Sequence, residues 1–139
     1  MGVTTTNKLG LEQPGVRKAN NAGLVAMNAA VANFVLHTMP TTMISTAKVR
    51  KIMAFNNTGA ATFLQLGYLT LAAVFVQTIP DLLCLAAVEN IWTEADIPNY
   101  EWRPDTTLVT GTLGDIVAQI TVCPANQVRI ILEVEELRQ

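Results

Sequence analysis

The stretch VRKIMAFNNTGAATFLQLGY, residues 49–68, decides the fold that we expect. Residues 49–55 are β-prone, and residues 61–68 resume the same character after a polar break. The break is Asn-Asn-Thr-Gly at 56–59, and asparagine and glycine tolerate the positive φ that a tight turn needs. The stretch therefore predicts two antiparallel strands joined as a hairpin.

The return segment of this stretch also predicts which side chains are buried. Leu64, Leu66 and Tyr68 alternate with Gln65 and Gly67. Because successive side chains of a strand point to opposite faces, the three large groups share one face. We expect that face to line the core.

The C-terminus repeats the pattern. Apolar residues alternate along residues 116–122 and again along 128–135, with Pro-Ala-Asn at 124–126 between them. The outer positions of 128–135 are largely charged, as is typical of a solvated or edge strand. The segment predicts a second hairpin.

Residues 69–88, LTLAAVFVQTIPDLLCLAAV, are long enough to span a bilayer. Gln77, Pro80 and Asp81 stand in the middle of this segment, where a charge costs several kcal/mol. Two strands, apolar on both faces and joined by a Pro-Asp turn, explain it better, and we expect no membrane insertion. Strands of this kind are covered on both sides, by a second sheet and by a neighbouring subunit or loop.

Short strands with turns between them predict an all-β fold, an antiparallel β-sandwich or barrel with an extended N-terminal arm. The arm covers residues 1–22, which are rich in Thr, Asn and Gly, and a single β-rich domain covers 23–139. Residues 24–37 fit a helix or a strand, and a strand is favoured from Val31 onward. We expect a core that includes Phe55, Leu64, Leu66, Phe75, Ile120, Ile130, Leu132 and Val134.

Composition indicates a chain whose surface is partly covered. Of its 139 residues, 50% are hydrophobic and 14% are charged, against roughly 25% charged in average soluble proteins. Residues 1–70 hold six basic residues and one acidic residue, a net +5, whereas 71–139 hold three basic and ten acidic residues, a net −7. These halves either pair between copies or meet within one fold. The basic residues are too few, and too free of interleaved aromatics, to predict nucleic-acid binding.

Residue types that carry chemistry are scarce. His37 is the only histidine and has no nucleophile motif beside it, so it reads as a residue at a strand end. Cys84 and Cys123 lie 39 positions apart without a CxxC motif, and either a disulfide or two buried thiols is open. Zinc needs about four ligands. We therefore predict no catalytic residue, no metal site and no cofactor.

Residues 89–107, ENIWTEADIPNYEWRPDTT, predict a long structured loop that is rich in aromatic and acidic residues. Two of its acids could cleave a glycosidic bond, with Glu94 or Glu101 as the reacting group, but nothing else in the loop supports a hydrolase. Its aromatic residues could stack on sugar, anchor a protein interface or plug the end of the core. The aromatic residues are Trp92, Tyr100 and Trp102.

Together these segments resemble the small head-decoration, or cement, proteins of tailed bacteriophages. The resemblance lies in the Thr/Asn-rich arm, in FNNTGAATFLQLG at 55–67, in IWTEADIPNYEW at 91–102 and in ANQVRIILEVEEL at 125–137. It is a likeness of layout over most of residues 48–139. Tail and other head accessory proteins of phages share the look.

The resemblance implies a non-enzymatic structural protein on the outer capsid surface of a virion, made in the host cytoplasm. Such proteins bridge major capsid subunits, often as homotrimers, and bring no catalytic residues. We expect a homo-oligomer, with a trimer favoured, and a carbohydrate-binding β-sandwich module as the alternative. The arm's basic groups suit an acidic groove on a neighbour, so the candidate interface residues are Lys8, Arg17, Lys18, Trp92, Tyr100 and Trp102.

Overall fold

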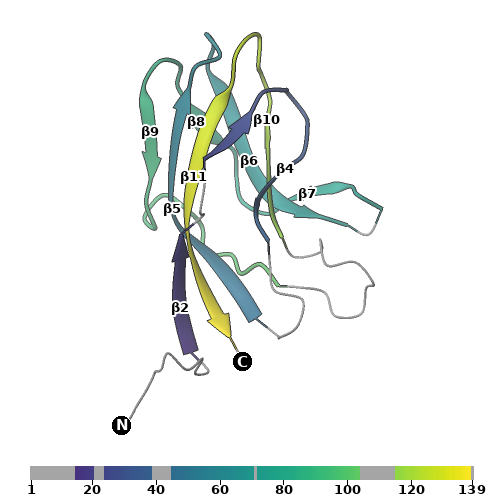
Figure 1. The fold of residues 1–139 in the computed structure, drawn as a ribbon, viewed down its shortest axis with the longest axis vertical. Coiled ribbons are helices and arrows are strands. Elements are labelled where there is room, and N and C mark those ends of the chain that lie inside the picture. The colour runs from purple at the N-terminus through teal and green to yellow at the C-terminus, as the bar shows by residue number, and fades with distance from the viewer. Residues whose placement is uncertain (1–14, 21–23, 39–44, 71, 104–114, 139) are drawn as a thin grey trace.

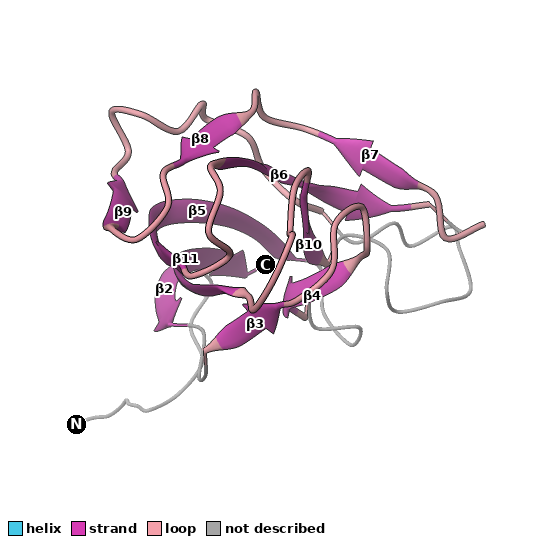
Figure 2. Ribbon diagram, turned by 90° about the horizontal axis from the view of Figure 1, so that it is seen from above, coloured by secondary structure: helices cyan, strands magenta, loops and turns pink. Residues whose placement is uncertain are grey.

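A computed structural model describes residues 15–20, 24–38, 45–70, 72–103 and 115–138 (Figure 1). In these ranges all regular structure is β-strand. The strands form two antiparallel sheets packed against each other, which confirms the predicted all-β sandwich (Figure 2).

The first sheet, called here the β6 sheet, has five strands in the order β4-β10-β6-β7, with β8 also paired to β6. Strands β7 and β8 follow each other along one edge of β6 and do not pair with each other, contrary to expectation. The bounds are β4 Phe34–His37, β6 Thr62–Leu69, β7 Phe75–Gln77, β8 Leu82–Cys84 and β10 Ile116–Ile120.

The second sheet, called here the β5 sheet, has the order β2-β11-β5-β9, with β3 also paired to β11. Strand β11 is central in this sheet. Strands β2 and β3 pair with successive parts of one edge of β11, and β5 pairs along its other edge. The bounds are β2 Gly15–Asn20, β3 Val25–Met27, β5 Ser45–Asn56, β9 Glu89–Trp92 and β11 Val128–Arg138.

Both predicted hairpins are wrong in their pairing. Strand β5 pairs with β11 and β9, whereas β6 pairs with β10, β7 and β8. The turns at 56–60 and 121–127 therefore carry the chain from one sheet to the other. Gly59 has a φ of 88°, so the first turn uses the positive φ that the sequence indicated. Asn126 has a φ of 55°, so the second turn uses a positive φ as well.

A buried asparagine explains why the first turn crosses between sheets. The side-chain amide of Asn56 donates to the carbonyl oxygens of Ala60 at 2.8 Å and Cys84 at 3.1 Å. Its side-chain oxygen accepts from the backbone N–H of Thr58 at 3.0 Å and from the Thr58 hydroxyl at 2.6 Å. These bonds use the polar groups that a hairpin turn would leave to solvent, and they attach the end of β5 to the end of β8.

The core lies between the sheets. Leu64, Leu66, Ile120, Ile130, Leu132 and Val134 are all fully buried, as the alternation predicted. The prediction was wrong for two aromatic residues. Phe55 is 36% exposed because Ala54 and Ile52 take the inward positions of β5, and Phe75 is half-buried on the edge strand β7.

The N-terminal third also departs from expectation in part. Residues 15–20, predicted as part of a free arm, form β2 and pair with β11 from Glu133 to Arg138. Residues 1–14 and 21–22 of the predicted arm lie outside the described residues. The ambiguous segment 24–37 forms two short strands, and Val31 between them has a φ of 56° and donates its N–H to the carbonyl of Ile120 at 2.8 Å.

Candidate interaction surfaces

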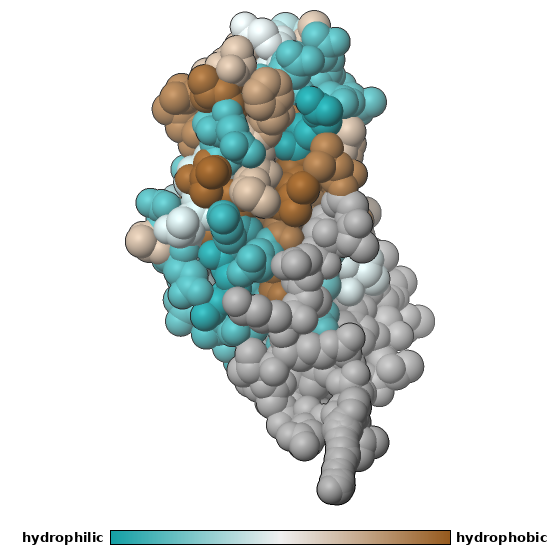
Figure 3. Space-filling view, turned by 60° about the vertical axis from the view of Figure 1, so that its left-hand side comes forward, coloured by the Kyte–Doolittle hydropathy of each residue, from teal (hydrophilic) through white to brown (hydrophobic). Residues whose placement is uncertain are grey.

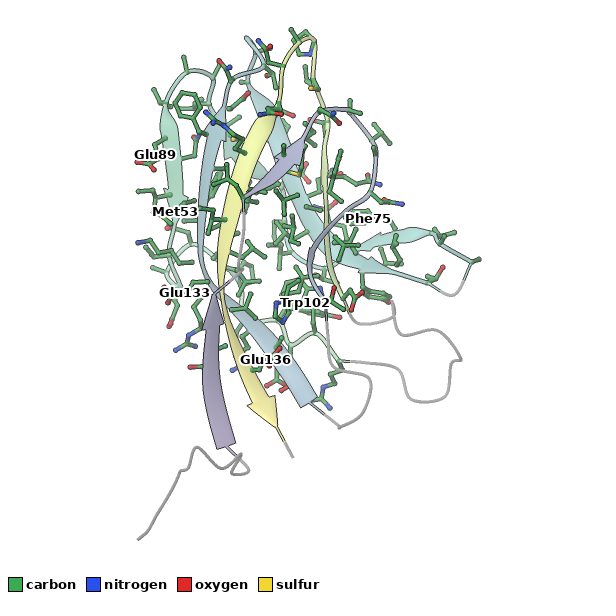
Figure 4. All side chains as sticks on the ribbon, viewed as in Figure 1. Met53, Phe75, Glu89, Trp102, Glu133 and Glu136 are labelled. Carbon is green, nitrogen blue, oxygen red and sulfur yellow. The ribbon has the colours of Figure 1, made fainter. Side chains whose placement is uncertain are left out.

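Trp102 is a core residue and not a surface anchor. Its side chain is 1% exposed and lies between the two sheets (Figure 4). Its indole N–H donates to the carbonyl of Gly67 at 2.8 Å, and its backbone exchanges two hydrogen bonds with Ala47. The ring of Tyr100 meets it edge-on, with centroids 4.8 Å apart. A ring enclosed in this way offers no face to a sugar, so the stacking platform predicted for carbohydrate is not formed.

The other predicted interface residues lie in different parts of the chain. Trp92, at the end of β9, and Tyr100 are half-buried and pack against the core, and burial raises the pKa of the Tyr100 phenol. Arg17 and Lys18 belong to β2, where the register places them opposite Glu136 and Glu135. Lys8 lies outside the described residues. Among the described side chains of this set, Trp102 is enclosed in the core and Trp92 and Tyr100 are half-buried, so these three aromatic residues do not form one exposed surface.

The basic and acidic halves of the chain meet within the fold. Arg50 on β5 contacts Glu94 at 2.7 Å and Glu135 at 3.6 Å, and Lys48 contacts Glu101 at 3.9 Å. A polar hollow of about 260 Å³ lies beside these pairs. Because both of its cations already face carboxylates, the hollow has no unmatched charge for an anionic ligand.

His37 stands at the end of β4, as predicted, but it has a partner that the sequence did not reveal. Its Nε2 lies 2.7 Å from a carboxylate oxygen of Glu136 on β11. The contact joins the two sheets through side chains that are both largely buried. A separation of 99 residues hides such a pair from any local pattern.

The two cysteines are free thiols in different surroundings. Cys84 is fully buried, and burial raises the pKa of its thiol from 9.0 to about 11. Cys123 is half-exposed. Among the residues that the structure describes, no three His, Cys, Asp or Glu side chains are grouped so as to hold a metal ion. The same residues include no helix that is long and apolar enough to cross a membrane.

Exposed apolar side chains follow one another along β8 and the connection to β9, beside Phe63 of β6. Phe63 on β6 and Leu83 on β8 are register partners across the ladder, and Leu85 follows two residues after Leu83. Val88 ends the connection from β8 to β9. The four are between 43% and 50% exposed, and we call them the β6 patch.

Hydrogen bonds hold the β6 patch in place. Asn90, buried on β9, accepts from the N–H of Leu85 at 3.0 Å and donates to the carbonyls of Leu85 and Val88 at 3.0 and 3.1 Å. The sequence indicated part of this surface, because segments 71–79 and 82–88 are apolar on both faces. It did not show that Phe63 completes the cluster.

Comparison with known proteins gives little. No family model matches the chain, and no curated protein matches it. Among solved structures, the chain is similar to one from Bacillus endospore appendages, described as a novel family of disulfide-linked pili. The two share 9% sequence identity, with 91% of each chain covered and a TM-score of 0.48. This likeness is too distant to bear on function.

Proposed function

We propose that this chain is a structural virion protein that decorates the outer surface of an assembled capsid and stabilises it, without catalysing a reaction. It is made in the host cytoplasm, attaches to the major capsid protein and acts as a homo-oligomer. The β6 patch carries the proposal, together with the sequence resemblance to phage head-decoration proteins.

The β6 patch has the properties of a protein-docking surface. Two of its large apolar side chains, Phe63 and Leu83, stand on paired strands, and the backbone groups of the other two are bonded to the Asn90 side chain. Little backbone conformational entropy is therefore lost when the β6 patch is covered. Burying a Leu, Val or Phe side chain fully is worth about 1.5–3 kcal/mol, so covering the exposed halves of four supplies roughly 3–6 kcal/mol. Association itself costs about as much or more. Attachment through this patch alone is therefore weak, and a repetitive shell that binds several linked copies makes it strong.

Stabilisation of the shell follows from mass action. A protein that binds the assembled shell and not the separate subunits shifts the equilibrium toward the shell. The β6 patch suits this role because a rigid sheet face can cover a surface that exists only when two subunits adjoin.

The test is co-sedimentation with shells assembled from the major capsid protein of the same genome. We expect the wild-type chain to pellet with shells and not with unassembled subunits. Leu83→Lys, which places a charge in the β6 patch, should abolish pelleting. Val35→Lys is the matched control, because Val35 is 43% exposed in the same sheet but on β4, away from the patch.

Two results would contradict the proposal. If the wild-type chain does not pellet with shells at any concentration, it is not a decoration protein. If Leu83→Lys pellets as well as the wild type, the β6 patch is not the docking surface. A glycan that binds the wild-type chain would point to the carbohydrate-binding alternative instead.

A further inference from the structure

A second apolar surface lies on the outer side of the β5 sheet, and the proposed function does not use it. Figure 3 shows hydrophobic side chains gathered on the upper half of this side of the molecule. They border a shallow hollow of about 210 Å³. We call this surface the β5 patch, and its residues are Leu24, Met53, Phe55, Glu89, Ile91, Arg129 and Ile131.

Strand register arranges the β5 patch in two rows across the sheet. Ile131, Met53 and Ile91 are partners on β11, β5 and β9, and they form an apolar row. Ile91 is 50% exposed, and Leu24 extends the same surface beside Ile131 at 53% exposed. Figure 4 shows Met53 on the outer side of the sheet, away from Trp102 in the interior.

The second row carries both signs of charge. Arg129 on β11, Phe55 on β5 and Glu89 on β9 are register partners, two residues along from the apolar row. The guanidinium of Arg129 lies over the Phe55 ring, 5.9 Å from its centroid. In the part of the chain that the structure describes, neither Arg129 nor Glu89 has an ion-pair partner. The order across the sheet is thus positive, aromatic, negative, with Phe55 at the centre.

We infer that the β5 patch binds a second copy of this chain, face to face, about a two-fold axis that runs along β5. Such an axis exchanges the β11 and β9 sides of the patch. Arg129 of one copy then faces Glu89 of the other, twice, while the two apolar rows pack on each other. A two-fold contact needs a surface that complements itself, and a row with a positive residue on the β11 side of Phe55 and a negative residue on the β9 side meets that need.

The alternative two-fold axis lies across the strands. Midway between the rows, it would lay the charged row of each copy on the apolar row of the other; along the charged row, it has a different consequence. It leaves the β11 and β9 sides where they are, so that Arg129 faces Arg129 and Glu89 faces Glu89. Like charges facing each other across an interface are repulsive. The charge order therefore selects the axis as well as the partner. The inference is independent of shell binding, because the β5 and β6 patches belong to different sheets. A dimer of this kind points its two β6 patches in opposite directions, so it brings one β6 patch to a given shell.

The first test compares two variants with equal exposure. Ile91 and Leu83 are both 50% exposed on short edge strands, one in each patch. We expect the wild-type chain to sediment as a dimer at micromolar concentrations and Ile91→Lys to lower the association constant more than tenfold. Leu83→Lys should dimerise like the wild type. A monomeric wild type at hundreds of micromolar, or Ile91→Lys that dimerises normally, would overturn the inference.

The second test reverses the two charges separately. Arg129→Glu and Glu89→Arg should each weaken dimerisation, because each homodimer then places like charges opposite each other in both contacts. When the two variants are mixed, both contacts of the mixed dimer regain opposite charges, so we expect heterodimers to form with an affinity near that of the wild type. Circular dichroism of each variant checks that the fold is intact.

Mixing also separates a dimer from the trimer that the family resemblance implies. A head-to-tail ring of three must contain two neighbours of the same variant, so the mixture cannot restore all of its contacts. A wild-type trimer, or a mixture that remains monomeric, would overturn the two-fold arrangement. If Leu83→Lys dimerises but does not bind shells, both proposals are supported. If the wild-type chain does not bind shells while Ile91→Lys loses dimerisation, the proposed function fails and the two-fold dimer is still supported.

Discussion

Replacing Trp102 with alanine should lower the free energy of unfolding by about 3–5 kcal/mol, the usual cost of removing a buried aromatic ring. The backbone bonds to Ala47 survive the change, but the ring volume, the edge-on contact with Tyr100 and the hydrogen bond to Gly67 are lost. Trp102→Phe keeps a ring in the same space and loses the N–H donor. Leaving the Gly67 carbonyl without that donor should cost about 1–3 kcal/mol.

Denaturant unfolding followed by far-UV circular dichroism measures both changes, since tryptophan fluorescence would alter with the mutation itself. Equal slopes against denaturant would show that the three proteins unfold from comparable states. Trp92→Phe is the control, because Trp92 is half-buried at the end of an edge strand, and we expect it to cost less than about 1 kcal/mol. If Trp102→Ala lowers the free energy of unfolding no more than Trp92→Phe does, then Trp102 does not fill the end of the core. The result would then favour Trp102 as an interface residue.

The remaining predictions concern the core and the thiols. Leu132→Ala should cost about 2–5 kcal/mol in the same unfolding assay, because Leu132 is fully buried, and a cost below about half a kcal/mol would contradict the register of β11. Gly67→Ala should detach β7, seen as faster amide hydrogen exchange at Val76, because a Cβ at Gly67 would lie 1.8 Å from the carbonyl oxygen of Val76. An alkylating reagent at pH 8 should label Cys123 and spare fully buried Cys84 until the chain unfolds, as mass spectrometry would show. The free energy of unfolding should fall as pH rises from about 9 to about 11, because the Cys84 thiol loses its proton in the unfolded chain while burial keeps it protonated in the folded chain. In Cys84→Ala this fall should be shallower.

The sequence predicted which side chains face the core. Leu64, Leu66, Ile130, Leu132 and Val134 are fully buried because a strand can bury only every second residue, and alternation shows that directly. Phe55 was misassigned because its size suggested burial, although the same alternation with Ile52 and Ala54 turns it outward.

Strand partners could not be predicted in the same way. Alternation with a period of two shows which side chains of a strand point into the core. Those side chains are the same whether the following strand along the chain joins the same sheet or the opposite one. The choice between hairpin and crossing depends on contacts such as that from Asn56 to Cys84, 28 residues apart. The positive-φ turn residues are compatible with both.

The candidate surfaces also depend on strand pairing that the sequence does not show. Leu83 and Leu85 were visible as part of a segment that is apolar on both faces, but their neighbour Phe63 comes from a strand placed beside them by the sheet. The row of Arg129, Phe55 and Glu89 combines three strands and has no local signature. Residues 89–107 show no sustained period, so the sequence does not decide between a buried and an exposed Trp102. A backbone bridge to Ala47 holds Trp102 between the sheets.

The measurement that tests the central claim most directly is the stability of assembled shells with and without this protein. Shells of the major capsid protein from the same genome would be heated or titrated with denaturant at increasing concentrations of the chain. We predict that the disassembly midpoint rises with concentration and levels off when the binding sites are filled, and that Leu83→Lys leaves it unchanged. A midpoint that stays constant at every concentration of the wild-type chain would contradict the account.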